Sequence, residues 1–181
     1  MSLHNDLDAS AAEMIRSATM DPLSDTKTVS RAQDIVRGVI RMLGEMDYAP
    51  IQEFTLGSGR RADIAALDPK GRILIVEIKS SLADFRTDQK WQTYLDYCDA
   101  FSFAVDQDFP RDVLPPETGL IIADRYGAAI LRPPFEQSLN ANRRRAETIR
   151  FARHAAGRLA QVQQLSPALT GRPDPYLISK P

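Results

Sequence analysis

Two acidic residues and a lysine are spaced in a way that could support metal-dependent hydrolysis. The segment Arg61–Ser81 reads RADIAALDPKGRILIVEIKSS, and its apolar run Ile73–Val76 ends in Glu77-Ile78-Lys79. Such a β-branched run is typical of a central strand of a sheet. The core would hold a carboxylate and an ammonium at its end rigidly, as catalysis requires. The simpler interpretation is a solvated cross-strand ion pair, which contributes little to stability.

The segment Asp68-Pro69-Lys70-Gly71 predicts how the strands on either side of it pair. Its composition fits a type I turn followed by a left-handed glycine, the usual three-residue hairpin loop. Asp68 then pairs with Arg72, and counting outward places Asp63 opposite Glu77 on the same face. Lys79, two residues further on, joins that face. A two-residue loop would instead put the two acids on opposite faces.

Two carboxylates brought together repel each other unless a positive charge lies between them. Lys79 could supply it, but a hard divalent cation suits the site better, because Mg²⁺ is typically held by one or two carboxylates and completes its shell with water and phosphate oxygens. We therefore expect Asp63 and Glu77 as ligands of Mg²⁺ or Mn²⁺, with the Ile78 carbonyl as a further protein oxygen. Lys79 would orient the attacking water and neutralise charge on the phosphate.

The remaining pattern predicts one mixed α/β sheet with helices packed on it. Helices are expected at about 30–46, 88–98 and 138–163, and strands at 51–56, 61–67, 72–79, 101–105, 119–123 and 128–131. Residues 1–27 are interpreted as a loose leader with a short helix near 11–18, and residues 28–134 as the folded domain. Residues 135–165 are expected to form a basic helix packed on that domain, and residues 166–181 a proline-rich tail.

Composition excludes several classes of protein. The 181 residues are 43% apolar and 26% charged with a net charge of −1, so any surface for nucleic acid must be local. One cysteine and two histidines argue against a disulfide framework and a structural zinc site. No apolar run approaches the ~20 residues of a membrane span, and the N-terminus does not resemble a secretion signal. A cytoplasmic protein, with Cys98 in its core, is expected.

The motif and its surroundings resemble a known family. Asp63 followed by Glu77-Ile78-Lys79 is similar to the PD-(D/E)XK nuclease superfamily, although Ala62 stands where the motif has proline. The stretches EFTLGSGRRADIAAL and VEIKSSLADFRTDQKWQTYLDYCDAFSFAV more specifically resemble MmcB-like DNA-repair endonucleases of bacteria, a likeness that extends from about residue 30 to 134. The resemblance implies a restriction-endonuclease-like αβββαβ core. It also implies that Asp63 and Glu77 bind metal and that Lys79 is the catalytic lysine.

Other residues could complete the site. Glu53 could reach Asp63 as a third acid or be an exposed strand residue, and Asp34 on the first helix is a weaker candidate. Ser80 could contact a phosphate, although capping of the following helix by Ser80-Ser81 is the simpler interpretation. Related nucleases often place a substrate-contacting Gln or Lys after the metal-binding strand, which makes Lys90 a candidate here.

Arginines provide two candidate DNA-binding surfaces. Arg60 and Arg61 precede Asp63 and suit phosphate contact, or are solvated on a turn. The last helix contains NRRRAETIRFARHAAGRLA, with six arginines against one glutamate. Its arginines, Arg143, Arg144 and Arg145 above all, could track a phosphate backbone. Alternatively, the helix packs through Ile149, Phe151 and Leu159 with its arginines in water.

Three functions are compatible with these features. The leading hypothesis is a metal-dependent deoxyribonuclease that acts on damaged, branched or single-stranded DNA, with other repair proteins as further partners. The second is a noncatalytic DNA-binding or scaffolding protein that retains the fold. The third is a Holliday-junction resolvase, which would require a symmetric homodimer. The complete set Asp63, Glu77 and Lys79 favours catalysis, because a scaffold has no need of it.

Overall fold

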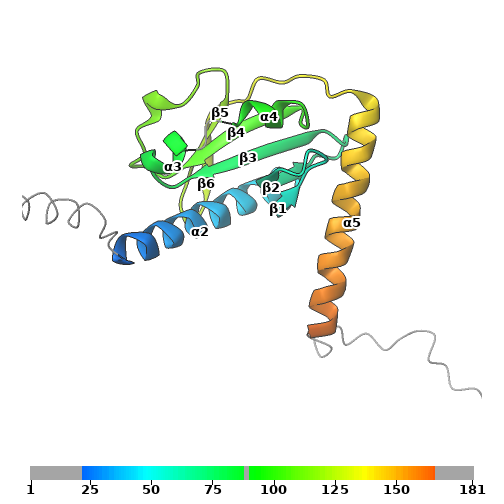
Figure 1. Cartoon of the computed structure of the whole chain (residues 1–181), viewed down its shortest axis with the longest axis horizontal. Helices are drawn as coiled ribbons and strands as arrows, with labels where there is room; N and C mark the ends of the chain where they lie inside the picture. The colour runs from blue at the N-terminus through cyan, green and yellow to red at the C-terminus, as the bar shows by residue number, and fades with distance from the viewer. Residues whose placement is uncertain (1–21, 88–89, 166–181) are drawn as a thin grey trace, which may run out of the picture.

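The fold is a mixed six-stranded sheet flanked by helices, as predicted (Figure 1). The computed structural model describes residues 22–87 and 90–165. Strands follow one another across the sheet in sequence order. β1 to β3 pair antiparallel, β3 to β5 pair parallel, and β6 returns antiparallel to β5. The strands are β1 (Ala49–Thr55), β2 (Arg61–Leu67), β3 (Ile73–Lys79), β4 (Ala100–Val105), β5 (Gly119–Ala123) and β6 (Ala128–Arg132).

The helices differ from the predicted ones in two places. The first, α2, covers Pro22–Glu45 and so begins before residue 30. The single helix expected at 88–98 is wrong: α3 (Leu82–Thr87) and α4 (Gln92–Leu95) are short, and residues 88–89 are outside the described part. A 3₁₀ turn covers Arg111–Val113, and α5 covers Ala141–Leu165. Most of the leader, its helix near 11–18, and the tail at 166–181 also lie outside the described residues.

The sheet separates two hydrophobic cores. On one face α2 packs its apolar stripe, which includes Ile35, Val39 and Leu43, against residues of β2, β3, β4 and β5. On the other face α3, α4 and β4 contribute an aromatic cluster in which Trp91 stacks on Phe101. All seven residues of β3 are buried, so this strand lies at the centre of both cores. Cys98 is a core residue, as expected, and Trp91 is buried as well.

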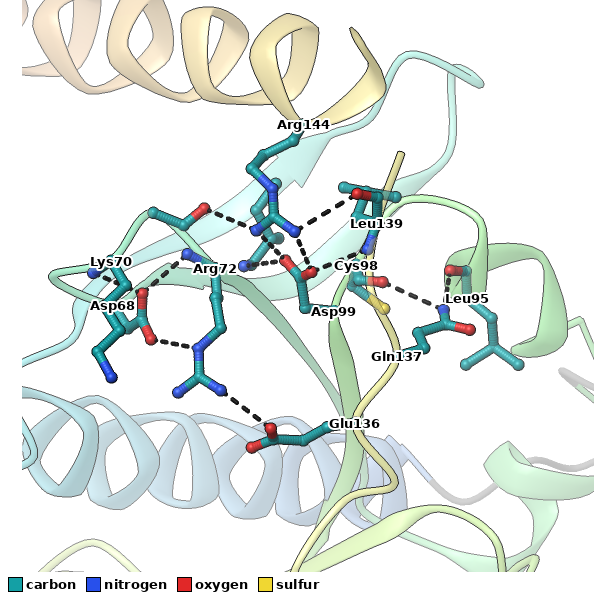
Figure 2. Close-up of polar contacts among 12 residues, drawn as sticks. Asp68, Lys70, Arg72, Leu95, Cys98, Asp99, Glu136, Gln137, Leu139 and Arg144 are labelled. Atoms are coloured by element: carbon teal, nitrogen blue, oxygen red, sulfur yellow. Dashed lines mark hydrogen bonds and ion pairs between the residues drawn. The ribbon is translucent and has the colours of Figure 1, made fainter. Parts of the chain in front are cut away.

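The hairpin between β2 and β3 has the predicted register. Ile64 pairs with Val76 and Leu67 with Ile73. The Gly71 amide donates to the Asp68 carbonyl at 2.9 Å, and Gly71 has the left-handed φ of +75°. The Asp68 carboxylate accepts hydrogen bonds from the Arg72 side chain and from the amides of Lys70 and Arg72 (Figure 2). Burial alone would raise the pKa of Asp68, but these hydrogen bonds outweigh it and hold that pKa below its usual value.

Helix α5 is attached to the domain through the first half of its length. The Glu147 carboxylate, 2% exposed, accepts the Gly57 amide at 3.1 Å, and Phe151 packs on Phe54. A Cβ on Gly57 would lie 2.6 Å from that carboxylate oxygen, so a larger residue here would force the Glu147 side chain to shift. The second half extends past the sheet (Figure 1). Of the three predicted packing residues only Phe151 is buried; Ile149 and Leu159 are more than half exposed, which corrects that expectation.

Gly71→Ala tests the turn that sets the register. Nothing lies within 4 Å of an added Cβ, so the expected effect is the backbone penalty alone, a loss of about 1–2 kcal/mol in the free energy of unfolding. Gly127→Ala is the matched control, because Gly127 also has open space around it but no left-handed φ. Chemical denaturation of both variants measures the difference. Equal losses would mean that the backbone at Gly71 is not strained by a side chain.

Candidate active site

The two predicted acids meet where the ladder between β2 and β3 ends. Regular pairing stops at Ile64–Val76, one step before Asp63 and Glu77. Beyond it, the Asp63 amide donates to Glu77 Oε1 at 3.3 Å, and the Ile78 amide donates to Asp63 Oδ2 at 2.8 Å. The two carboxylates therefore replace missing backbone hydrogen bonds and cross-link the strands. This arrangement places both acids at one point, as the register predicted.

The neighbouring strand is distorted at the same level. Residues on either side of Glu53 pair with residues on either side of Asp63, but Glu53 itself has a left-handed φ of +52°. A non-glycine residue in this region is strained by roughly 1–3 kcal/mol, and such strain is concentrated at functional sites. Ile51 and Phe54 consequently face the same core although they are three residues apart. The sheet is thus irregular around the acid pair while its core remains regular.

The acid pair faces a cavity of about 780 Å³ at the edge of the sheet. Asp63, Glu77, Ile78 and Lys79 line its floor, and α2 forms one wall. Its ionisable lining comprises three basic and four acidic side chains: Arg37, Arg61 and Lys79 against Glu53, Asp63, Glu77 and Asp84. When all of these groups are ionised, the cavity is slightly acidic despite its arginines. A phosphate group would require further positive charge to bind there.

Lys79 lies beside the acids, at the end of the buried strand. Its Nζ is 4.0 Å from Glu77 Oε2 and 3.9 Å from Asp84 Oδ1, and the residue is only 4% exposed. Two carboxylates on different segments therefore face the ammonium group, which stands at the floor of the cavity. The Lys79 ammonium group is therefore placed where it could contact a bound phosphate without a large movement of its side chain.

Burial and mutual repulsion determine the protonation of the pair. Burial is the main reason that the pKa of Glu77 rises to about 8, and the charge of Asp63 adds to it. Burial also raises the pKa of Asp63, against the hydrogen bond from the Ile78 amide and the charge of Lys79. Both groups thus hold a proton more readily than they do in water. A cation between them would remove this cost.

The donor set fits a divalent cation held by two carboxylates. Within residues 22–87 and 90–165, no three His, Cys, Asp or Glu side chains gather closely enough to hold a metal ion. Mg²⁺ commonly needs only one or two protein carboxylates, and Asp63 with Glu77 meets that requirement. Both acids are largely buried, and burial raises the pKa of each although Lys79 acts in the opposite direction. Asp63 and Glu77 are therefore the residues that would hold Mg²⁺ or Mn²⁺, with Ile78 beside them.

Glu53 does not complete a third ligand position. It lines the same cavity, but its carboxylate is 2.6 Å from the Arg61 guanidinium, on the rim. Asp34 is paired with Arg37 instead. Arg60 lies over the Tyr94 ring and donates to the Lys90 carbonyl. Arg61 lines the cavity together with the acids, whereas Arg60 lies outside its lining, and each is held by a neighbour within the protein.

The expected roles of Ser80 and Lys90 receive little support. The Ser81 hydroxyl accepts the Asp84 amide, which confirms that this dipeptide caps the next helix. The Ser80 amide donates to the Asp84 carboxylate and the Ser80 side chain is buried, so both serve local structure. Lys90 is exposed, outside the lining of the cavity. Its contact with substrate stays a prediction.

The three consecutive arginines of α5 have different surroundings. Arg144 is 27% exposed, donates two hydrogen bonds to the buried Asp99 carboxylate, and also contacts the Gly71 carbonyl (Figure 2). Asp99 accepts the Ile73 and Leu139 amides as well, so the pair joins α5 to both central strands. Arg144 is therefore a structural anchor, and its role as a DNA contact stays a prediction.

Its neighbours on the helix are more accessible. Arg143 lies over the Tyr97 ring at 5.0 Å and donates to the Asp96 carbonyl, so it too is engaged by the protein. Arg145 is exposed. Of the three, Arg145 retains the surroundings expected of a phosphate contact, and that role stays a prediction.

Sequence reasoning missed three residues that line the cavity. The Tyr94 hydroxyl donates to the Arg61 carbonyl at 3.0 Å and lies within hydrogen-bonding reach of the Glu77 carboxylate. Gln33 and Arg37 come from α2 and lie on the wall. The single helix expected at 88–98 obscured the separate position of Tyr94. Gln33 and Arg37 are polar and four residues apart on α2, so their pattern does not differ from that of an ordinary solvent-exposed helix face.

Comparison with known proteins decides the family. The family model described as DNA repair protein MmcB-like matches residues 8–166. The chain belongs to the MmcB-like family. This MmcB-like chain also resembles the solved structure of the SPO1766 protein of unknown function from Silicibacter pomeroyi. The two share 44% identity and a TM-score of 0.71, over 79% of this chain and 95% of the other. No curated protein matches the sequence.

In the described part of the MmcB-like chain, none of the helices combines the length and apolar character needed to cross a bilayer.

Replacing Arg144 and Arg145 separately by Ala distinguishes an anchor from a surface residue. Arg144→Ala leaves the buried Asp99 carboxylate without its cation, which should lower the free energy of unfolding by about 3 kcal/mol. Arg145→Ala removes an exposed side chain and should change it by less than about 0.5 kcal/mol. Denaturant titration of the two variants gives the comparison, and equal stabilities would contradict the anchor.

Glu77→Gln should change how stability depends on pH. The wild-type carboxyl has a pKa of about 8 when folded, against an ordinary value of 4.5, so its contribution to stability is fully present below about pH 4.5 and is lost as pH rises through 8. Glutamine does not titrate and can still accept the Asp63 amide. In EDTA, the melting temperature of the variant relative to wild type should therefore increase from about pH 5 to about pH 9. Glu45→Gln, at an exposed site, is the control, and parallel curves for all three proteins would contradict the raised pKa.

Proposed function

We propose that this MmcB-like protein is a metal-dependent deoxyribonuclease that hydrolyses phosphodiester bonds during DNA repair. The family supports the DNA repair role. The observation that carries the proposed chemistry is the meeting of Asp63, Glu77 and Lys79 on the floor of one cavity. Two acids and a lysine in this arrangement are the groups that phosphoryl hydrolysis with a divalent cation requires.

Each side chain has a defined task in this proposal. Asp63 and Glu77 bind the cation, and their hydrogen bonds to the amides of Ile78 and Asp63 fix their orientation before it arrives. Bound Mg²⁺ or Mn²⁺ would supply positive charge to the phosphate and lower the pKa of a coordinated water. Lys79, close to Glu77 Oε2, can hydrogen-bond the attacking water and stabilise charge that develops on phosphate oxygens.

The charge balance of the cavity supports dependence on a metal. When Asp63 and Glu77 are both ionised, as metal binding requires, the acidic groups outnumber the basic ones by four to three, so a phosphate would meet net repulsion without the cation. A divalent cation reverses that balance. The exposed Arg61 at the rim and Arg145 on α5 could then guide the DNA backbone through sequence-independent, salt-sensitive contacts.

A noncatalytic DNA-binding protein is the alternative that a specific observation favours. Each acid already accepts a hydrogen bond from a backbone amide of the other strand, and among the described residues no third acid joins the pair. The pair could therefore serve only to close the sheet. The two functions differ in whether DNA is cut.

Cleavage of labelled DNA with Mg²⁺ or Mn²⁺, compared with EDTA, tests the proposal. The panel contains single-stranded, duplex, flap, junction and abasic DNA. Lys79→Met keeps the side chain's bulk but removes its charge, and should slow cleavage at least about 100-fold while the protein stays folded by circular dichroism. Lys70→Met, at the exposed hairpin turn, is the control and should cleave like wild type. Binding of DNA without cleavage of any form would support the noncatalytic alternative.

A further inference from the structure

Tyr94 stands between the two strands that carry the acid pair. It comes from the short helix α4, on the face of the sheet opposite α2, and is 4% exposed. Its side chain nevertheless lines the same cavity as Glu77 and Lys79. A core aromatic residue thus presents its one polar atom to the candidate site.

The Tyr94 hydroxyl contacts both strands just beyond the end of their ladder. Its single proton can be donated either to the Arg61 carbonyl on β2, at 3.0 Å, or to the Glu77 carboxylate on β3. Arg61 precedes Asp63 by two residues, so the hydroxyl joins the segments that carry the two acids. Regular backbone pairing ends at Ile64–Val76, and this hydroxyl is one of the few links that hold the strands at a defined separation beyond it.

The ring of Tyr94 has little freedom to move. It stacks on Phe101 with ring centroids 6.0 Å apart and an interplanar angle of 13°. The Arg60 guanidinium carbon lies 5.6 Å from the ring centroid. Aromatic stacking and the cation–π contact each favour one ring orientation. The core therefore determines where the hydroxyl lies.

We propose that Tyr94 is a positioning residue: its hydroxyl sets the separation of β2 and β3 at the site and orients the Glu77 carboxylate for a divalent cation. The inference rests on the proposed function, because it assigns Tyr94 to the metal site required there. Groups that orient metal ligands affect affinity although they do not touch the metal, and losing one typically costs 10–100-fold in affinity or activity. A purely structural tyrosine would affect stability instead.

Tyr94→Phe removes the hydroxyl and keeps the stacked ring. Tyr97→Phe is the matched control, since Tyr97 lies in the same segment but packs under Arg143. Isothermal titration of the metal-free proteins with MnCl₂ measures the affinity. We expect Tyr94→Phe to bind Mn²⁺ about 10–100-fold more weakly than wild type, and Tyr97→Phe to match wild type.

A second readout separates positioning from packing. Excess Mn²⁺ should restore much of the cleavage rate of Tyr94→Phe, because weaker metal binding is its main defect, and KM for DNA should stay unchanged. Loss of ring packing would not respond to metal in this way. Circular dichroism first establishes a temperature at which all three proteins are folded, so a lower melting temperature does not affect the comparison.

The outcomes are distinct. Wild-type Mn²⁺ affinity in folded Tyr94→Phe would overturn the role of Tyr94 and leave the proposed nuclease intact. Equal weakening in Tyr94→Phe and Tyr97→Phe would also overturn it, because the effect would then come from general disturbance of the segment. Absence of both Mn²⁺ binding and cleavage in the wild-type protein would remove the proposed function itself, and this inference with it.

Discussion

The site depends on one exchange of hydrogen bonds, in which two carboxylates take the place of a missing step in the β2–β3 ladder. Asp63 accepts the Ile78 amide and Glu77 accepts the Asp63 amide, so each acid is fixed by a backbone group near the other. The exchange opens the sheet where it meets the cavity and brings two negative charges together in a buried place. Their raised pKa values express the cost of this arrangement. A bound cation would offset that cost, and this is the physical link between the fold and the proposed chemistry.

The rest of the molecule maintains that opening. The β2–β3 hairpin determines which residues face each other, and Gly71 and Asp68 determine the hairpin. Asp99 joins the start of β3 to the start of β4 and, through Arg144, to α5, so the end of β3 distant from the acids is firmly held. At the open end, Tyr94 replaces backbone pairing with a side-chain link. β3 is therefore held by regular structure at one end and by side-chain contacts at the other. This arrangement fixes the end of the strand that carries Glu77 and Lys79.

Much of this could be predicted from sequence because it depends on local rules. The residues of the turn predicted the hairpin register, and runs of β-branched residues predicted the strands. The meeting of Asp63 and Glu77 then followed from counting residues. Features that depend on tertiary contacts were missed or misassigned. The short α4 replaces a predicted longer helix because aromatic packing, not helical periodicity, determines residues 91–98. Arg144 looked like a surface cation because its partner, Asp99, is forty-five residues away in the sequence. Nothing in the sequence predicted the left-handed backbone conformation of Glu53, because the amino-acid composition of a strand does not show strain at a non-glycine residue.

The central claim is that Asp63 and Glu77 share a divalent cation where β2 and β3 separate. Anomalous diffraction from a crystal of the protein with bound Mn²⁺ tests it most directly. The account predicts a single strong anomalous peak in contact with one carboxylate oxygen of each acid, at about 2.0–2.3 Å, with Lys79 nearby. An anomalous map without a peak there at saturating Mn²⁺, with the two acids unchanged and still bonded only to the backbone, would contradict it.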